Sequence, residues 1–472
     1  MRVRRFRIVA GATSVVLIAG CATTSIDQQN RQLQELTTPT LGAPAALRST
    51  DPARAEARRN VQQRLVNSLS ADDAVRAALD NSPALQALLS EHVEATAAAV
   101  QSARISNPVF TFERLVRGDV TEFGRMLSLS LLDVLTLPAR SRIADQTAQT
   151  NTVRAAAELV QLANEVRAAW VQAVAAHQQV NYYADVRSAA ETAAELAQRM
   201  QGVGSFNKLQ RAREQAFYAD AVTQQARAQH AATAARERLV RLLGLDAEQS
   251  AMLKLPERLP DLPAAPREAA ALQRQAFEQR LDVRLARHNL DATAAAHGLT
   301  RVTSWVDALH LGVIRNSETG EPVQRGYEVE LPLPLFDFGD ARRAGSQAAY
   351  LAALNRTAQV AVDARSQVNE AYSGYRTAFD IARHYRDEIV PLRKMIADEN
   401  LLRYNGMLIG VFELLADARA QVASVITAID AQKDFWLADA TLNAALIGRP
   451  IMSISLATPR AAGETGGEAG GH

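Results

Sequence analysis

Four short stretches of the chain alternate apolar and polar residues, whereas most of the sequence has the longer spacing of helices. The clearest stretch alternates leucines with Ser128 and Ser130, and a later one alternates apolar residues with Glu328 and Glu330. A period of two residues places neighbouring side chains on opposite faces of a strand. The sequence therefore predicts four strands, at 109–115, 125–132, 309–313 and 327–331.

Long alanine-rich segments separate these strands and predict helices. No proline lies between Pro138 and Pro256, and Gly202 and Gly204 divide this stretch into two helical arms. The first arm, 139–201, would be about 95 Å long at a rise of about 1.5 Å per residue. Its apolar residues recur at alternating spacings of three and four, which is the seam of an antiparallel coiled coil. The second half carries the same seam at Val368, Tyr372, Tyr375, Phe379 and Ala382.

The body of the chain looks duplicated. Gly202 is matched by Gly406, and Gly244, which follows two leucines, is matched at the same spacing by Gly448 after Leu446 and Ile447. An internal repeat with a constant offset indicates two copies of one structural unit. We therefore expect a first helix–strand–strand–helix repeat, a proline-rich linker and a second repeat, at 68–253, 254–266 and 267–450.

The N-terminus has the pattern of an exported lipoprotein. Several arginines precede a short apolar run, and the segment ends in Ile18-Ala19-Gly20-Cys21. The run is shorter than a membrane-spanning helix and fits a secretory signal. A buried apolar helix is the alternative interpretation. We expect a signal peptide at 1–20, a lipid-anchored polar tether at 21–67 and a flexible tail at 451–472.

Composition excludes several classes of function. The chain has 52 basic and 51 acidic residues, so its charge gives no indication of nucleic-acid binding. Cys21 is the only cysteine, and the eight histidines lack the spacing of zinc ligands. We find no catalytic constellation and no nucleotide-binding motif. The sequence therefore predicts a protein that is not an enzyme and has no metal site or cofactor.

The strands favour a membrane location over a soluble sheet, which is the alternative. Their lengths approach the roughly 9–11 residues that a tilted strand needs to cross a bilayer, and apolar-out, polar-in alternation is typical of membrane barrels. Four strands would leave unpaired edges in lipid, so several chains must contribute. Pro138, Pro332 and Pro334 are expected where strands end and the chain leaves the sheet.

These features together resemble the TolC family of outer-membrane efflux proteins. The resemblance rests on the lipoprotein signal, the two repeats, Asn107-Pro108 before the first strand, and Arg403-Tyr404-Asn405-Gly406 followed by Leu414–Arg419. It implies a mainly helical fold: a long coiled-coil tunnel plus four transmembrane strands per chain, in a barrel closed by trimerisation. It also implies a homotrimer anchored in the outer membrane, with a periplasmic adaptor and an inner-membrane pump as partners.

The pattern and the resemblance together nominate site residues. Lipid would be attached at Cys21, as in palmitate-bearing lipoproteins, and the polar strand residues Ser128, Ser130, Glu328 and Glu330 would face the barrel lumen. The helix-breaking turns would form the periplasmic tips that meet the adaptor: Gly202, Gly204, Asn207, Gly406, Gly410 and Val411.

Asp417 resembles the acidic gate position of the family, and a solvated helical aspartate is the alternative. The expected function is a passive exit duct of a tripartite efflux system. A periplasmic coiled-coil adaptor lipoprotein is the second candidate, and it is disfavoured by the presence of two hairpins and four strands. A lipoprotein enzyme is the third candidate. The exported substrate is not encoded in any motif that we recognise.

Overall fold

The computed structural model describes residues 25–268, 280–306 and 308–448. Cys21, the predicted signal peptide and the predicted C-terminal tail therefore lie outside the described residues. The chain divides into two compact units, each built from three segments. The strand unit comprises Met1–Arg48, Leu85–Val160 and Gln279–Arg365, and the hairpin unit comprises Ser49–Ala84, Gln161–Glu278 and Ser366–His472.

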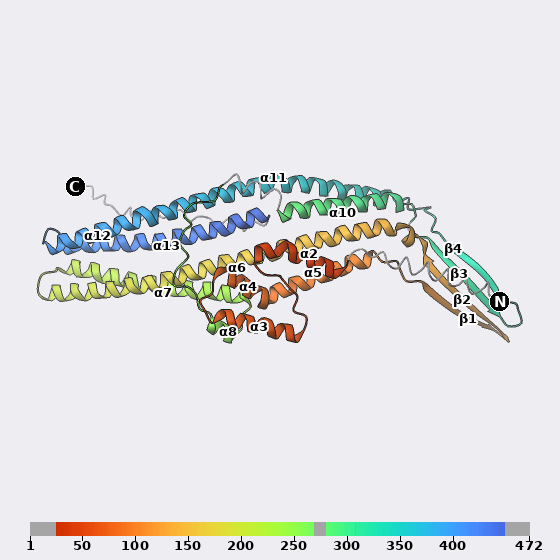
Figure 1. Ribbon diagram of the computed structural model, residues 1–472, viewed down its shortest axis with the longest axis horizontal. Helices are drawn as coiled ribbons and strands as arrows, with labels where there is room; N and C mark the ends of the chain where they lie inside the picture. Colours follow the sequence, from red (N-terminus) through yellow and green to blue (C-terminus); the bar gives the residue numbers. More distant parts are fainter. Residues whose placement is uncertain (1–24, 269–279, 307, 449–472) are drawn as a thin grey trace, which may run out of the picture. The chain divides into compact units, whose positions relative to one another are not determined.

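The strand unit contains one antiparallel sheet of four strands, in the order β1-β2-β3-β4 (Figure 1). Its strands are β1 Val109–Arg117, β2 Val120–Ser130, β3 His310–Glu318 and β4 Gln324–Glu330. Two hairpins form the sheet, and pairing of β2 with β3 joins them. The prediction of four alternating strands, two from each half of the chain, is confirmed.

The end of β2 differs from the expectation. The strand stops at Ser130, and helix α6, Leu131–Gly202, begins at the next residue. The Ser130 hydroxyl accepts a hydrogen bond from the Asp133 N–H at 3.2 Å, which satisfies one of the free donors of the first helical turn. Pro138 therefore lies inside α6 rather than at the strand end. Pro332 and Pro334 do follow the end of β4, as predicted.

The remaining helices of the strand unit flank the strand pairs in both halves, some before and some after them. They are α2 Ile26–Leu41, most of α5 Pro83–Ser102, the start of α6, α10 Leu281–Thr303 and the start of α11 Asp340–His384. Within this unit, every strand end that leads into a helix, directly or through a short connection, lies at the same edge of the sheet.

The N-terminal segment differs from the polar tether that the sequence analysis expected. Residues Ile26–Leu41 form α2, capped by the Ser25 side chain, and Leu33 and Leu41 are buried. The Thr152 hydroxyl donates a hydrogen bond to the Gln29 carboxamide at 2.7 Å. Spaced leucines gave α2 enough apolar surface to pack, although its polar composition resembled a linker.

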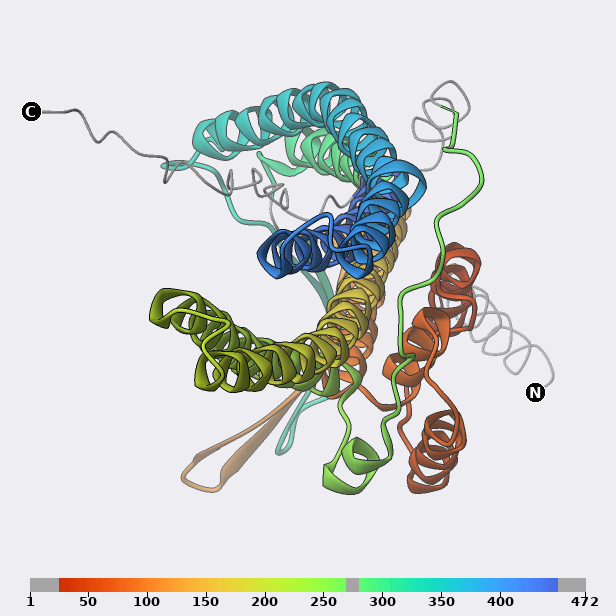
Figure 2. The same cartoon turned by 90° about the vertical axis from the view of Figure 1, so that its left-hand side faces the viewer.

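The hairpin unit consists of paired helices with short turns (Figure 2). Its elements are α3 Asp51–Leu65, α4 Ala71–Asn81, α7 Lys208–Leu243, α8 Ala247–Met252, η1 Tyr385–Ile389, α12 Val390–Asn405 and α13 Val411–Ile447, together with the ends of α6 and α11. α3 also falls in the expected tether; its buried face consists of Ala57, Val61 and Leu65.

The predicted seams are buried in the structure. Val368, Tyr375 and Phe379 of α11 pack with Phe435 of α13, whose ring centroid lies 5.5 Å from that of Tyr375 and 5.7 Å from that of Phe379. Alanines dominate the buried positions of α6, which lets neighbouring helices approach closely. The seam prediction is confirmed by this packing.

The repeated glycines end helices at matching places. Gly244 follows α7 and Gly448 follows α13, and both adopt a left-handed conformation, with φ of 69° and 95°. Asn81, just before α5, donates a hydrogen bond from its carboxamide to the Gly244 carbonyl at 2.6 Å. A Cβ atom on Gly244 would lie 2.6 Å from Pro83 Cδ. The turn therefore requires glycine for two independent reasons.

Gly244→Ala is predicted to destabilise the hairpin unit by more than about 1–2 kcal/mol, because the left-handed backbone and the Pro83 contact both penalise a methyl group. Gly202→Ala is the matched control, since a Cβ there meets nothing within 4 Å. It should be neutral or stabilise by about 0.4–1 kcal/mol. Thermal unfolding followed by circular dichroism measures both, and equal midpoints for the two variants would contradict the packing described for Gly244.

Candidate functional site

One face of the sheet is apolar. Directly paired residues form cross-strand rows: Leu129 opposite Leu311, which is opposite Val329, and Phe110 opposite Leu127, Val313 and Tyr327 in turn. All seven side chains are exposed, and Tyr327 has 81% of its surface accessible. We call this surface the apolar face. A large exposed apolar patch marks a surface that meets a partner or a membrane.

The opposite face carries all the strand glutamates and most of the polar strand residues, with a few apolar side chains such as Val109 and Leu115 among them. Ser128, Gly312 and Glu328 form one row, and Ser130, His310 and Glu330 form the next. The four strand residues nominated from the sequence, Ser128, Ser130, Glu328 and Glu330, therefore share one face. The alternation also puts Glu113, Glu122 and Glu318 on this face. We call it the acidic face; the only basic side chains on it are Arg117 and His310.

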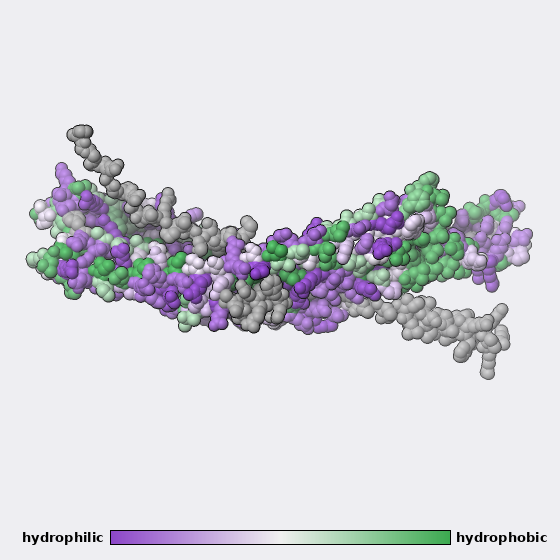
Figure 3. Space-filling model, turned by 90° about the horizontal axis from the view of Figure 1, so that it is seen from above, coloured by the Kyte–Doolittle hydropathy of each residue, from purple (hydrophilic) through white to green (hydrophobic). Residues whose placement is uncertain are grey.

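The apolar face continues past the end of β4. Leu331, Leu333, Leu335, Phe336 and Phe338 are all exposed, and Phe336 has 98% of its surface accessible. Figure 3 shows apolar residues over the part of the sheet next to the helices and hydrophilic residues toward the hairpin turns. The apolar surface is therefore a band across the strand unit, concentrated near the helices.

β1 and β4 are the edge strands of this sheet, and no other described strand pairs with them. Every residue of both strands is exposed. Unpaired strand edges are ready to pair with another chain.

The two helix turns of the hairpin unit carry the nominated tip residues. α6 ends at Gly202, and Asn207 caps α7: its side chain accepts from the Gln210 N–H at 2.9 Å, while the Gln210 side chain accepts from the Asn207 N–H at 2.7 Å. Gly406 follows α12, and Val411 begins α13 after Gly410. Both predicted turns are confirmed.

The turns also expose apolar side chains that the sequence analysis did not nominate. Val203 has 79% of its surface accessible, Met407 93% and Leu408 78%. Met407 also adopts a positive φ of 58°, which is uncommon for residues other than glycine. Each turn thus combines a backbone reversal with apolar side chains in solvent, a composition suited to protein contact.

Asp417 lies on α13 and is partly buried. Its carboxylate accepts a short hydrogen bond from the carboxamide of Asn400 on α12, the other helix of the same hairpin. Asn400 is buried. The sequence analysis named Asp417 as a gate candidate, which stays a prediction, and did not anticipate this partner. The bond holds the two helices of the hairpin together close to their tip.

An ion pair with a buried carboxylate joins the hairpins of the two repeats. Arg419 of α13 lies 2.7 Å from the Glu214 carboxylate of α7, and only 1% of Glu214 is exposed. The Arg419 guanidinium also stacks 4.5 Å from the centroid of the Phe217 ring. The sequence analysis missed this pair because its members belong to different repeats and neither repeat carries both. A charged residue on an otherwise apolar helix face was the only available signal.

A second polar link between the repeats lies further along the same helices. The Gln179 carboxamide of α6 donates to the Asp430 carboxylate of α13 at 2.9 Å. Tyr183 lies one turn away, and burial, aided by the charge of Asp430, raises the pKa of its phenol. Val422 of α13 packs against a small apolar cluster of Val186, Ala190 and Ala221 from α6 and α7. Within the hairpin unit, these two polar links connect helices of the first repeat to α13 of the second.

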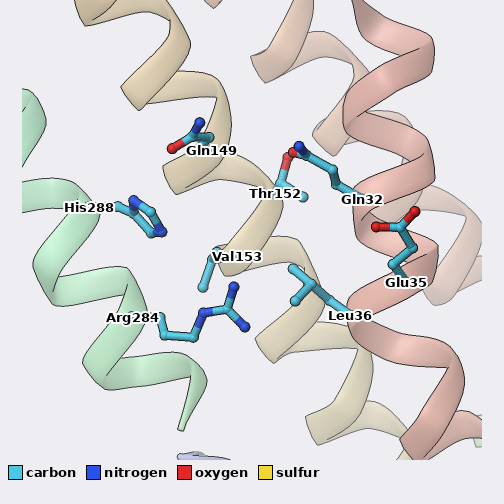
Figure 4. Close-up of a pocket in the computed structure, with 8 residues that line it drawn as sticks. All are labelled: Gln32, Glu35, Leu36, Gln149, Thr152, Val153, Arg284 and His288. Atoms are coloured by element: carbon cyan, nitrogen blue, oxygen red, sulfur yellow. The ribbon is translucent and has the colours of Figure 1, made fainter. Parts of the chain in front are cut away.

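A groove of the strand unit lies beside α6 (Figure 4). It has a volume of about 340 Å³. Burial, together with the positive charge of Arg284, lowers the pKa of His288. The residues lining it come from α2, α6 and α10: Gln32, Glu35, Leu36, Gln149, Thr152, Val153, Arg284 and His288. No nucleophile in this set is hydrogen-bonded to a base, so the groove offers no catalytic arrangement.

Two features are absent from the described residues. No group of three or more histidine, cysteine, aspartate or glutamate side chains in this part of the chain is arranged to hold a metal ion. No helix among residues 25–268, 280–306 and 308–448 is both long enough and apolar enough to cross a bilayer.

Comparison with solved structures identifies the fold. A membrane protein from Pseudomonas aeruginosa aligns with a TM-score of 0.68 at 19% identity, covering 82% of this chain and 93% of that chain. VceC, an outer membrane protein of Vibrio cholerae, aligns with a TM-score of 0.65 at 14% identity. The alignment covers 84% of this chain and 97% of that chain. The MtrE outer membrane channel of Neisseria gonorrhoeae, in its open state, aligns with a TM-score of 0.65 at 17% identity. The alignment covers 82% of this chain and 89% of that chain.

No protein-family model matches the chain, and no curated protein matches it in sequence. The structural alignments cover nearly the whole of each of these proteins, so the likeness is to the complete fold and not to one hairpin. The chain has the fold of outer-membrane channels. The fold that the sequence resemblance implied is therefore confirmed.

Proposed function

We propose that this protein is the outer-membrane channel of a tripartite efflux system, a passive exit duct for substrate delivered from the periplasm. The observation that carries the proposal is the two-faced sheet: an exposed apolar face backed by an acidic one, on a fold shared with outer-membrane channels. A periplasmic adaptor, the second candidate, would not need an exposed apolar sheet of this kind.

Three chains assemble into the working channel in this proposal. Exposed edges on β1 and β4 cannot remain unpaired in lipid, because each free N–H and C=O group costs several kcal/mol there. Pairing of β4 with β1 of the next chain would satisfy both edges and keep the apolar faces on one side. Three sheets then close a barrel whose acidic faces line the lumen, with Ser128, Ser130, Glu328 and Glu330 in contact with water.

The turns of the hairpin unit form the adaptor contact. Gly202, Gly204, Asn207, Gly406, Gly410 and Val411 set the shape of these turns, and Val203, Met407 and Leu408 supply apolar surface. Docking of an adaptor would bury these side chains and stabilise one arrangement of the hairpins. An inner-membrane pump would supply the energy, since the chain carries no nucleotide-binding motif.

Asp417 and the Glu214–Arg419 pair form the gate. Both links hold helices near the tips, and the Glu214–Arg419 pair does so across the two repeats. Separation of the repeats would leave Glu214 without its charge partner, so the closed arrangement is favoured until an adaptor compensates. Three copies of Asp417 around a narrow mouth would also attract cations.

Cys21 anchors the mature chain to the outer membrane by a lipid. The support is the arginine-rich start, the short apolar run and the small residues before the only cysteine. In this proposal residues 1–20 are removed as a signal peptide.

The purified protein is predicted to form channels in planar bilayers. Glu214→Gln and Asp417→Ala should raise the open fraction, because each removes a link that keeps hairpins together. Glu413→Ala is the matched control, an exposed carboxylate near the start of α13. Absence of any conductance from correctly assembled protein would refute the duct. An open fraction equal to that of wild type in both variants would contradict the proposed role of these residues in the gate. The proposal that the protein is an exit duct would still stand.

Met407→Asp and Val203→Asp are predicted to abolish export by cells that lack the wild-type copy, while conductance of the purified variants stays unchanged. The reason is that a carboxylate in an apolar docking surface must be desolvated on binding. Val222→Asp, on an exposed part of α7 away from the turn, is the control. Export is measured as the amount of each compound that the cells take up and retain, for a panel of antibiotics, dyes and metal ions. Normal export by both tip variants would exclude the turns as the adaptor contact.

The N-terminal peptide of the protein isolated from membranes is predicted to begin at Cys21 and to carry a diacylglyceryl group and a further acyl chain. Cys21→Ser should lack this mass and lose part of its membrane retention, since the strands still insert. Mass spectrometry decides the matter, and an unmodified chain that begins at Met1 would rule out the lipid anchor.

A further inference from the structure

A row of arginines interrupts the apolar face. The strand register pairs Arg125 with Arg315 and Arg315 with Arg325, so three guanidinium groups lie side by side across β2, β3 and β4. The alternation places them on the same face as Leu127, Val313 and Tyr327. Arg114 of β1 lies on this face as well, one row nearer the hairpin turns, opposite Phe123. We call these four residues the arginine belt.

The sheet itself does not neutralise this charge. The apolar face of the four strands contains no aspartate or glutamate, because all the strand glutamates lie on the acidic face. Among the described residues, none of the carboxylates comes within ion-pair distance of the belt. Like charges directly opposite one another on adjacent strands destabilise a sheet. Three adjacent arginines therefore indicate a negatively charged partner outside the sheet.

Aromatic contacts hold part of the belt against the strands. The guanidinium groups of Arg114 and Arg125 lie 6.0 Å and 5.7 Å from the centroid of the Phe123 ring. Arg114, Arg315 and Arg325 are exposed. Stacking on a ring leaves the N–H groups of an arginine free to donate at their edges. The belt therefore presents donors outward from a fixed position on the sheet.

The belt lies beyond the apolar band, on the side of the β-hairpin turns. It begins one row, about 7 Å, beyond the row of Leu127 and Val313, on the side of the hairpin turns. The helices attach at the opposite edge, and the band of exposed apolar residues lies between them and the belt (Figure 3). Arginine on the lipid face costs about 2–4 kcal/mol at the bilayer midplane but only about 0–1 kcal/mol near the interface. The belt thus fits the level of lipid headgroups.

We propose that the arginine belt binds phosphate groups of lipid headgroups in the membrane leaflet nearest the two β-hairpin turns, which join β1 to β2 and β3 to β4. Arginine presents a planar fork of donors that matches phosphate, and neighbouring arginines bridge the phosphates of one headgroup or of adjacent ones. The inference rests on the proposed function, because it requires the apolar face to contact lipid.

A neighbouring copy of the chain does not supply the missing negative charge. Edge pairing of β4 with β1 of the next chain continues the same face, and β1 contributes Phe110, Phe112, Arg114 and Val116 to it. None of these residues is acidic. Assembly would therefore extend the belt around the complex and raise its positive charge, which strengthens the case for an anionic lipid.

The test is native mass spectrometry of the full-length protein with lipid A, a glycolipid that carries phosphate monoesters. Wild-type protein should retain lipid A at least tenfold more tightly than dephosphorylated lipid A. The variant Arg125→Gln/Arg315→Gln/Arg325→Gln should lose this preference. Arg117→Gln, which removes an arginine from the acidic face of β1, should keep it. Addition of salt should weaken the preference of the wild-type protein for lipid A. The comparison of lipid A with dephosphorylated lipid A uses wild-type protein alone, so it does not depend on the folding of any variant.

Several results would overturn the proposal. One is equal retention of both lipids by wild type, and another is an unchanged preference in the triple variant. Displacement of lipid A by equimolar inorganic phosphate would show a site for free anions instead. Conductance of the same wild-type preparation is recorded in parallel. A conducting channel without phosphate preference refutes the belt alone, whereas a preparation that never conducts refutes the proposed function on which the belt rests.

Discussion

The hydrogen-bonded ladder between β2 and β3 joins the two halves of the chain. It runs from Glu122 opposite Glu318 to Ser130 opposite His310, and brings together residues that are far apart in the sequence. This register decides which side chains share a face. It aligns Leu127 with Val313 and Ser128 with Gly312, so the apolar and polar positions of both halves coincide. A shift by one residue would mix the two faces, since alternate side chains point in opposite directions.

The same register separates charge across the sheet. Five strand glutamates lie on the acidic face and four arginines on the apolar face. Such a separation costs stability in an isolated sheet, because like charges are neighbours and no cross-strand ion pairs form. It suits a sheet with water on one side and lipid with charged headgroups on the other. The proposed channel and the proposed arginine belt are two consequences of this one arrangement.

Local sequence signals predicted the elements of the fold better than their contacts. Alternation located all four strands, and the spacing of Val368, Tyr375 and Phe379 located a buried seam, because each depends on residues close in sequence. Helix α2 was taken for a tether, since its polar residues obscured a buried stripe at Leu33 and Leu41. Pro138 was expected at the strand end, but β2 ends at Ser130, and α6 begins at the next residue with the Ser130 hydroxyl as its cap.

Contacts between repeats were not predictable from one sequence. The Glu214–Arg419 pair and the Asn81 bond to Gly244 both join residues that no local pattern relates. The tip glycines were found because helix breakers are visible in sequence, yet the apolar side chains of Val203 and Met407 were overlooked beside them. Asp417 was nominated by resemblance, and its bond to Asn400 emerged only from the hairpin geometry.

The central claim is that one face of the sheet meets lipid and the other meets water. The chain is well suited to a direct test, because Cys21 is its only cysteine. In a Cys21→Ala background, single cysteines are placed at positions 127, 128, 129 and 130 of the protein reconstituted in vesicles, and a water-soluble maleimide is added. The account predicts rapid labelling at 128 and 130 and slow labelling at 127 and 129. Uniform labelling along the strand, or the reverse alternation, would contradict it.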